Sequence, residues 1–522
     1  MVSRSPERGS RPRLTPRRGR AQNEVSSRPL RRRRVIRTRP DYHRATGRPP
    51  RPGRNTASQS RVPQAAACDA EGRKQREDAV GAGTDAGFTT RQVHIGSDAV
   101  PATPRALPIH LTAGFTFGSF DDAAAHFGVG DGFGYTRTGN PTVDAVERKL
   151  ASLEGGAEAL LLASGQAALT VALLGLVAAG EHIVSSTHIY EGSRGLLLDN
   201  FARLGITVDF VDDIADPDAW RRAIRPTTRA LLAESIANAR NDVLDIAAVA
   251  AVGDEHGIPL VVDNTFATPY LVRPLEHGAA VVVHSASKFL AGQGAVLGGV
   301  VVDDGRFDAA TAAGRFPHLT DAASGPSLWE RHGGRARIAY LRESVAPRFG
   351  PTPSPLNAFL IGQGVETLSL RVQRQSENAL AVARWLQGRP EVARVDHAGL
   401  ASHPTHDTAR RYLRGGFGSV FTVTLRGGLP AARTVVDGLR VITHMTHLGD
   451  VRSLVLHPAS TSHTHRTAAQ QRAHGVEPGT LRLSIGIEDV DDLIADLGRA
   501  LDAVSATGAE PVPADRADPV VA

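Results

Sequence analysis

The sequence predicts an α/β protein in which helices cover both faces of a mostly parallel sheet, followed by a smaller C-terminal α+β domain. Between about residues 85 and 320, short apolar runs alternate with longer Ala- and Leu-rich stretches. Continuously apolar runs are typical of strands buried on both faces, as in parallel sheets. The predicted strands are Ala159–Ala163, His182–Ser185, Ala230–Ala233, Pro259–Val262 and Ala279–His284.

Helical spacing marks the stretches between these runs, for example Gln166–Ala179 and Ile246–His256. Residues 320–355 hold several Gly and Pro residues and predict irregular structure. A long amphipathic helix is expected from Gly364 to Arg389. The smaller domain is predicted from strand-like runs C-terminal to this helix, at Val392–His397, Gly418–Leu425 and Leu481–Ile485, and from a final helix at Val490–Val504.

We divide the chain into four parts: an extension (1–85), a large domain with an N-terminal arm (86–345), a small domain (346–507) and a flexible tail (508–522). The extension is rich in Arg and Pro, so it cannot bury enough apolar surface to offset its ordering entropy, and we expect disorder. Three interpretations stay open: a start assigned too early or an inert tail, an organelle-targeting peptide, and an arm for nucleic acid or a membrane surface.

The net charge of +6 is unevenly distributed. Residues 1–61 hold 19 arginines and three acidic residues, so the rest of the chain carries a net −10. Nucleic-acid binding is therefore not expected of the folded part. No run of 18 apolar residues predicts a membrane span, and no apolar run comes after the N-terminal charges as in a secretory signal. The single cysteine, Cys68, excludes an internal disulfide or a cysteine metal cluster, and we expect a cytoplasmic protein without a metal.

Lysine is rare, with three residues (Lys74, Lys149 and Lys288) against 57 arginines. Lys288 follows a buried strand and lies close to the hydroxyls of Ser285 and Ser287 in the sequence. Only lysine offers a primary amine that can lose its proton and attack a carbonyl, and desolvation favours that form. The alternative is a lysine that merely extends to solvent.

Three further positions follow predicted strands, where parallel sheets bind ligands. Asp263 ends an apolar strand, and its carboxylate needs a cation such as a protonated pyridine nitrogen, or else caps a turn. Gly165 lets the backbone approach a phosphate at a helix N-terminus, although small residues are common at such turns. Tyr190 could stack on a ring or belong to the core.

Several segments together resemble the Cys/Met-metabolism enzymes that depend on pyridoxal 5′-phosphate (PLP), a family of cystathionine synthases and lyases, methionine γ-lyase and homoserine-ester sulfhydrylases. These segments are Tyr135–Thr142, Leu153–Gly156, Ser164–Ala168, Val262–Thr265 and Ser285–Lys288. The resemblance extends from about Phe88 to Leu501 and implies fold type I of the PLP-dependent transferases, with the large domain binding the cofactor.

Within the family, the details are most similar to the O-acetylhomoserine sulfhydrylases. The segments that carry this likeness are Phe88–His94, Gly314–Pro317, Gly362–Leu368, His447–Leu454, His457–His463 and Leu481–Glu488. The resemblance implies a Schiff base between PLP and Lys288. It also implies that Asp263 pairs with the pyridine nitrogen, Tyr190 stacks on the ring and Asn238 reaches the phenolic oxygen.

The same resemblance implies a phosphate site on the backbone of Gly165 and Gln166 and the hydroxyls of Ser285 and Ser287. Tyr135 and Arg137 would bind the phosphate of a neighbouring subunit, so the active site is shared within a homodimer that normally doubles to a tetramer. The resemblance assigns catalytic roles to Lys288, Tyr190 and Tyr135. Arg482 would hold the substrate carboxylate, with Ser453 as a second substrate contact. Taken alone, Arg482 would be interpreted as half of a surface salt bridge.

The implied reaction replaces the γ-substituent of an O-acyl-L-homoserine, expected to be the acetyl ester, by sulfide or a small thiol. Cystathionine γ-synthase or a γ-lyase is the alternative within the family. One alternative outside the family is a dinucleotide-binding oxidoreductase, but the sequence lacks the Gly-x-Gly-x-x-Gly unit that such an enzyme needs at the start of a strand–helix unit. The other is a protein that binds nucleic acid through the Arg-rich tail. Four positions depart from the family pattern, namely Glu191, Ala239, Gln293 and His447.

Overall fold

The computed structural model describes residues 85–96, 104–129, 132–238, 240–308, 314–322 and 324–506. The predicted disordered extension, apart from residue 85, and the predicted tail at 508–522 lie outside the described residues. Ala239 also lies outside them.

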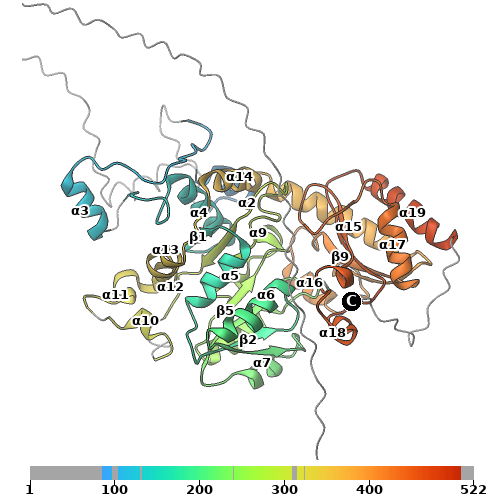
Figure 1. The fold of residues 1–522 in the computed structure, drawn as a ribbon, viewed down its shortest axis with the longest axis horizontal. Helices are drawn as coiled ribbons and strands as arrows, with labels where there is room; N and C mark the ends of the chain where they lie inside the picture. Colours follow the sequence, from blue (N-terminus) through green and yellow to red (C-terminus); the bar gives the residue numbers. More distant parts are fainter. Residues whose placement is uncertain are drawn as a thin grey trace, which may run out of the picture. The chain divides into compact units, whose positions relative to one another are not determined.

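A seven-stranded sheet occupies the middle of the described chain (Figure 1). Its strands, in sheet order, are β1 (Glu158–Leu162), β7 (Gly299–Asp303), β6 (Val281–His284), β5 (Leu260–Asp263), β4 (Thr228–Glu234), β2 (His182–Ser186) and β3 (Thr207–Val211). From β6 to β3 all neighbours are parallel, whereas β7 runs antiparallel to both β6 and β1. The predicted fold class, a mostly parallel sheet between helices with a smaller second domain, is confirmed.

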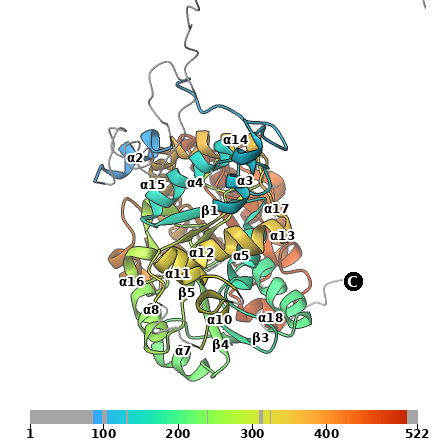
Figure 2. The same cartoon turned by 90° about the vertical axis from the view of Figure 1, so that its left-hand side faces the viewer.

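Helices cover both faces of this sheet because its strands are apolar on both sides. Successive residues of β5 show this alternation: Val261 packs into one buried cluster, and Leu260 and Val262 pack into the other. The cluster that holds Val261 includes α5 (Gly165–Leu174) and α12 (Ala336–Tyr340), and α12 comes to the front in Figure 2. The opposite cluster includes α4 (Pro141–Glu154), α8 (Ile246–Glu255) and α14 (Pro355–Val365).

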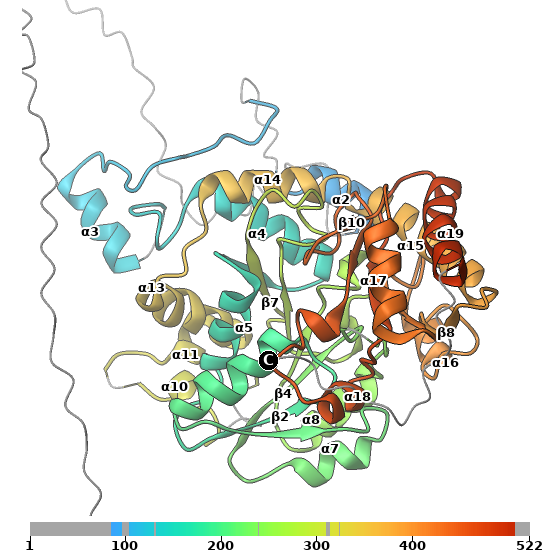
Figure 3. The ribbon, with the colours of Figure 1, turned by 45° about the vertical axis from the view of Figure 1, so that its right-hand side comes forward.

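A second, five-stranded sheet lies towards the C-terminus. Its order is β10 (Thr443–His444), β11 (Leu454–Leu456), β12 (Thr480–Ser484), β9 (Val420–Leu425) and β8 (Val392–Asp396). Three helices pack with it around a third apolar cluster (Figure 3): α15 (Leu368–Gln387), α17 (Gly428–Gly438) and α19 (Val490–Ala506). All pairs in this sheet are antiparallel except β10 with β11.

The remaining helical segments are short. They are α2 (Phe88–His94), α3 (Phe120–Val129), α6 (Glu191–Gly195), α7 (Pro217–Ala223), α9 (Thr268–Leu271), α10 (Pro317–Thr320), α11 (Leu328–His332), α13 (Ala346–Phe349), α16 (His406–Tyr412) and α18 (Ala468–Ala473). Single turns of 3₁₀ helix lie at Pro274–His277, Gly333–Arg335 and Pro458–Ser460, and π-helical turns at Leu196–Phe201 and Leu341–Val345. No helix in the described part of the chain combines the length and apolarity that a membrane crossing needs.

The prediction of irregular structure across residues 320–355 is wrong for most of that range. A nearly continuous helical run extends from Leu328 to Phe349. It starts at a capping box in which Ser327 and Glu330 exchange hydrogen bonds. Its segments are only three to five residues long, too short to show a helical period in the sequence. The predicted domain boundary at 345/346 falls inside this run and stays a prediction.

Candidate functional site

The loops after β1, β5 and β6 meet at the carboxyl edge of the large sheet. A Cβ atom added to Gly165, after β1, would lie 2.6 Å from the Cβ of Ser285, after β6. The amide of Ser285 donates to Oγ1 of Thr265, after β5, at 2.8 Å. Such an edge is where parallel sheets bind ligands, because the chain ends of neighbouring strands converge there.

Lys288 lies in the loop after β6 and is half-buried. It forms no ion pair with any residue that the structure describes. Burial, followed by the positive charge of Arg482, lowers the pKa of its amine to about 8. The free amine is therefore accessible near neutral pH, which is what attack on a carbonyl requires. Nζ lies 3.2 Å from Nδ1 of His447, a residue 159 positions away.

The two serines beside the lysine differ. Ser287 is buried, and its hydroxyl donates to the carbonyl of Gly298 at 3.2 Å and accepts from the amide of Gly298 at 3.0 Å. Ser285 is half-buried and lies against Gly165. Ser285 is therefore the more open of the two predicted phosphate contacts, and Ser287 ties the lysine loop to the start of β7.

A helix N-terminus lies beside Ser285. The side chain of Ser164 caps α5 by accepting from the amide of Ala167 at 3.2 Å. The amides of Gly165 and Gln166 form no hydrogen bond with any residue that the structure describes, and both residues are half-buried. A Cβ on Gly299 would overlap the backbone oxygen of Ser164, so β7 directly supports this turn. Free amides at a helix start suit a phosphate.

Asp263 lies at the end of β5, and only one of its two carboxylate oxygens accepts hydrogen bonds from described residues. Its Oδ1 accepts from the amide of Thr265 at 2.9 Å and from the hydroxyl of Thr265 at 2.5 Å. Its Oδ2 has no hydrogen-bond partner among the described residues. Burial raises the pKa of this carboxyl group above its usual range. A protonated ring nitrogen would supply the missing partner and favour the ionised form.

Glu234 is a second acid beside Asp263, and sequence reasoning gave it no role. Its carboxylate accepts from the amides of Tyr190 at 2.5 Å and Asn238 at 2.9 Å. Burial, and then the charge of Asp263, raises the pKa of Glu234 to about 8. Glu234 thus fixes the backbones of two predicted cofactor contacts. A role of this kind depends on how loops fold and leaves no local motif.

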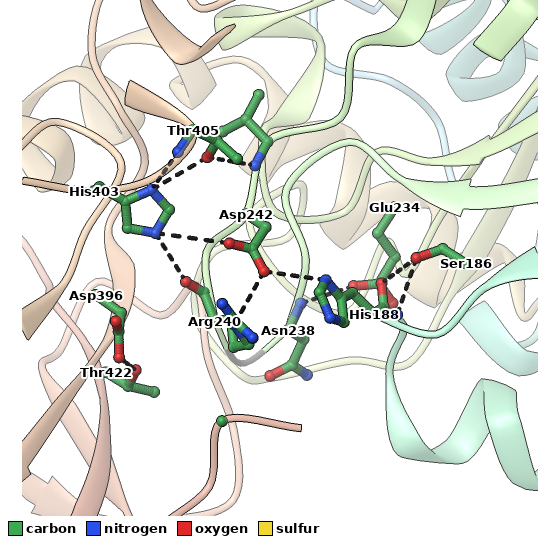
Figure 4. A network of polar contacts seen from close by, with 12 residues as sticks. Ser186, His188, Glu234, Asn238, Arg240, Asp242, Asp396, His403, Thr405 and Thr422 are labelled. Carbon is green, nitrogen blue, oxygen red and sulfur yellow. Dashed lines mark hydrogen bonds and ion pairs between the residues drawn. The ribbon is translucent and has the colours of Figure 1, made fainter. Parts of the chain in front are cut away.

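The loop that carries Asn238 is anchored by a polar network (Figure 4). The carboxylate of Asp242 pairs with Nδ1 of His188 at 3.1 Å and Nε of Arg240 at 3.2 Å. Burial alone would raise the pKa of Asp242, but these partners outweigh it and hold the pKa below the usual range. Nε2 of His403, between β8 and α16, lies 3.1 Å from the carbonyl oxygen of Arg240. The network therefore ties this loop to the C-terminal part of the chain.

Tyr190 follows β2 and is 45% exposed. Gly192 lies directly beside the tyrosine ring, since a Cβ there would overlap it. The carboxylate of Glu191, the departure next to the tyrosine, accepts from Nε of Arg466 at 2.8 Å. Its charge is therefore neutralised within the chain. Gln293, another departure, is exposed in the loop between Lys288 and β7.

Arg482, on β12, is buried and forms no ion pair with any described residue. Its Nη1 lies 3.5 Å from Oδ1 of Asn238, and its Nη2 lies 3.3 Å from the carbonyl oxygen of His447. Burial lowers its pKa to about 10, so it stays a cation at neutral pH. The alternative of a surface salt bridge is therefore wrong. Ser453, the other predicted substrate contact, is buried, and its hydroxyl donates to Glu488; its contact with substrate stays a prediction.

Tyr135 and Arg137 stand apart from this cluster. Tyr135 is 49% exposed, and the Arg137 guanidinium lies 5.4 Å from its ring centre. Arg137 also donates to the carbonyl of Pro347 at 2.7 Å. No hydrogen bond, ion pair or ring contact joins either residue to the others of the site in the described ranges. The chain alone therefore does not bring all the predicted site residues together.

The residues present fit PLP. The cofactor carries an aldehyde, a ring nitrogen, a flat ring and a phosphate. The structure offers an amine of lowered pKa at Lys288, an unused carboxylate oxygen at Asp263, an exposed aromatic ring at Tyr190 and free amides at the start of α5. Each chemical group of the cofactor thus has a complementary group at one edge of the sheet.

Comparisons with known proteins agree with this fit to PLP. A model of the family described as "Cys/Met metabolism PLP-dependent enzyme" matches residues 89–502. The O-acetyl-L-homoserine sulfhydrylase of Leptospira meyeri is 44% identical over 427 residues, covering 79% of this chain and 96% of the relative. The enzyme of the same name from Corynebacterium glutamicum is 43% identical over 418 residues, with the same coverage.

A solved structure is also similar. It is a putative O-acetylhomoserine (thiol)-lyase from Campylobacter jejuni, with a TM-score of 0.76 and 32% identity, covering 80% of this chain and 99% of that one. The Campylobacter protein carries a pyridoxyl-lysine monophosphate, that is, a cofactor linked to a lysine.

Proposed function

Because the chain belongs to the Cys/Met-metabolism family of PLP-dependent enzymes, we propose that it catalyses γ-replacement on O-acetyl-L-homoserine. Sulfide or a small thiol takes the place of acetate and gives homocysteine or methionine. The observation that carries this proposal is a pair of cations, half-buried Lys288 and buried Arg482, that have no acid partner among the described residues. The names of the relatives support the choice of substrate.

Bound PLP supplies an electron sink for charge that develops on the substrate. The free oxygen of Asp263 would pair with the ring nitrogen and favour its protonated form, and Glu234 holds the backbone amides of Tyr190 and Asn238. Tyr190 would stack on the ring. The amides of Gly165 and Gln166, with the hydroxyl of Ser285, would hold the phosphate.

Arg482 binds the α-carboxylate of the amino acid through its planar guanidinium. Its position between Asn238 and the His447 carbonyl fixes the direction of that group. Lys288 takes and returns protons at the carbon atoms of the substrate, because its lowered pKa lies near the working pH. The γ-substituent then leaves as acetate, and the sulfur nucleophile adds in its place.

The proposal includes a homo-oligomer. Tyr135 and Arg137 are exposed and separate from the other site residues, which is expected if they complete the site of a second copy. A dimer of such dimers in the cytoplasm is the arrangement we propose.

Product analysis tests the proposal. The full-length protein is incubated with PLP and either O-acetylhomoserine plus sulfide or O-succinylhomoserine plus cysteine. Homocysteine from the first mixture, at least about tenfold faster than cystathionine from the second, is the expected result. Faster cystathionine formation would instead identify a cystathionine γ-synthase, and formation of a 2-oxo acid without sulfur transfer would identify a γ-lyase.

A further inference from the structure

His447 lies between the two cations of the site. Its Nδ1 is 3.2 Å from Nζ of Lys288, and its carbonyl oxygen is 3.3 Å from Nη2 of Arg482. One residue of the C-terminal part thus contacts both the proposed cofactor-bearing lysine and the proposed carboxylate-binding arginine.

The segment that carries His447 is held from several sides. The amide of Gly449 donates to Oγ of Ser484 at 2.9 Å, and the amide of Val451 donates to the carbonyl of Gly292 at 2.9 Å. Gly449 has a φ of +71°, and a Cβ there would lie 2.8 Å from the amide nitrogen of Phe289, the residue after Lys288. The histidine backbone is therefore fixed relative to the lysine loop.

The surroundings determine the state of the imidazole. Burial, then the charge of Lys288, lowers the pKa of His447 to about 4, against an opposing effect of Asp450 and a supporting one of Arg482. The ring is therefore neutral at ordinary pH. A lysine ammonium only donates hydrogen bonds, so Nδ1 is the acceptor and the ring proton lies on Nε2. Nε2 is buried and has no hydrogen-bond partner among the described residues.

We propose that His447 is a positioning residue for Lys288, whose Nδ1 accepts a hydrogen bond from the lysine amine and holds it beside Arg482. Lysine has a flexible four-carbon stem, so an amine released during turnover would otherwise sample many positions. The acceptor also stabilises the protonated amine against the burial and the Arg482 charge that oppose it. The inference rests on the proposed role of Lys288, although its test needs neither substrate nor cofactor.

Because the chain has only three lysines, the pKa of a single lysine amine can be measured without interference from many others. The full-length protein, prepared without PLP, is labelled with a trace of an amine-reactive reagent between pH 6 and 10. Mass spectrometry of the Lys288 peptide then gives the apparent pKa of that one amine. Lys149, which pairs with Glu366 at 3.1 Å, reports any general change in the fold.

Two substitutions separate hydrogen bonding from packing. His447→Leu removes the acceptor, and we expect the pKa of Lys288 to fall by about one unit. His447→Asn keeps an amide oxygen, and the fall should be at most about half as large. His444→Leu is the matched control, because His444 is exposed and has no contact with the lysine, and it should leave the pKa unchanged.

An unchanged or raised pKa in His447→Leu would overturn the proposal, and so would equal falls in the Leu and Asn variants. His447→Met replaces the leucine variant if the latter does not fold, with the same expected result. The labelling does not depend on the reaction. If the Lys288 pKa falls in His447→Leu as expected but the protein forms no homocysteine, the proposed function is contradicted and this inference stands.

Discussion

Buried cations have different partners at the two ends of the parallel strands, the amino edge and the carboxyl edge of the seven-stranded sheet. At the amino edge, β7 ends at Asp303, opposite the first residue of β6. There, Nε of Arg337 donates to Oδ2 of Asp303 at 2.9 Å, and Arg337 also pairs with Asp304. At the carboxyl edge, Lys288 and Arg482 have no acid partner in the described part of the chain.

This difference separates structure from function. Buried charges are costly unless paired, so a fold that needs them only for stability pairs them, as at Asp303. Unpaired cations persist where a ligand supplies the missing anion. Under the proposed function, the unpaired cations at the carboxyl edge lower stability and serve binding, so substitutions at the two edges should have opposite effects on stability and activity.

Loss of the lysine should have the largest effect. Lys288→Ala removes the only lysine amine at the site among the described residues, and we expect γ-replacement to fall by roughly 1,000-fold or more. Lys149→Met is the comparison, since Lys149 is buried but paired. It should keep activity within about threefold and lower the free energy of unfolding by about 1–2 kcal/mol. Steady-state rates and urea unfolding measure both. Strong activity in Lys288→Ala would exclude the proposed mechanism.

The second largest effect concerns the acids at the two edges, Asp263 and Asp303. Asp263→Asn cannot keep a ring nitrogen protonated, and we expect kcat to fall by about 100-fold with PLP still taken up. Asp303→Asn should instead leave kcat nearly unchanged and lower the midpoint of thermal unfolding, because it weakens the pair with Arg337. Absorbance of bound PLP and kcat are the measurements. Equal losses of kcat in the two variants would remove the distinction between the edges.

The two arginines give a smaller and reciprocal effect. Arg482→Met should raise KM for the amino acid by about 100-fold, with no loss of stability in the ligand-free protein. Arg337→Met leaves buried Asp303 and Asp304 without a cation and should lower the free energy of unfolding by about 3–5 kcal/mol. Kinetics and urea unfolding on the same preparations separate the two outcomes. A loss of stability in Arg482→Met together with a higher KM in Arg337→Met would contradict the assignment of the functional site to the carboxyl edge.

The smallest expected effect concerns Glu234. Its pKa is raised to about 8 from 4.5, so the folded protein binds more protons than the unfolded chain between those values. Stability of the ligand-free protein therefore falls as the pH rises through this window. Glu234→Gln cannot ionise, and its stability, measured by urea unfolding, should fall by about 1–2 kcal/mol less between pH 5 and pH 8. An equal decline in both proteins would assign this pH dependence to other groups.

The sequence pattern predicted most of the large sheet, because buried strands such as β5 and β6 are apolar on both faces. It missed β3, whose residues are mostly half-exposed, and β7, which starts with a glycine and runs against its neighbours. It also missed the helical run that starts at Leu328, whose segments are shorter than the window of roughly 11–18 residues over which a helical period is detected.

The candidate site divides in the same way. Asp263 ends β5, and Gly165 and Lys288 come within a few residues of the ends of β1 and β6, so local patterns point to all three. Glu234 acts by accepting backbone hydrogen bonds, and the contact of His447 spans 159 residues. No local pattern carries information of that kind. Under the proposed function, Tyr135 and Arg137 act in the site of a second copy of the chain, which the sequence resemblance alone implies.

The reversal of β7 has one more consequence. Ser287 is bonded at both polar positions to Gly298, and Gly299 lies against the backbone of Ser164. The stretch of chain bearing the reactive amine therefore leaves the sheet and re-enters it at the same edge, clamped at its departure and at its return. Under the proposed function, a loop fixed at both of its ends would return Lys288 to the same location after each catalytic cycle.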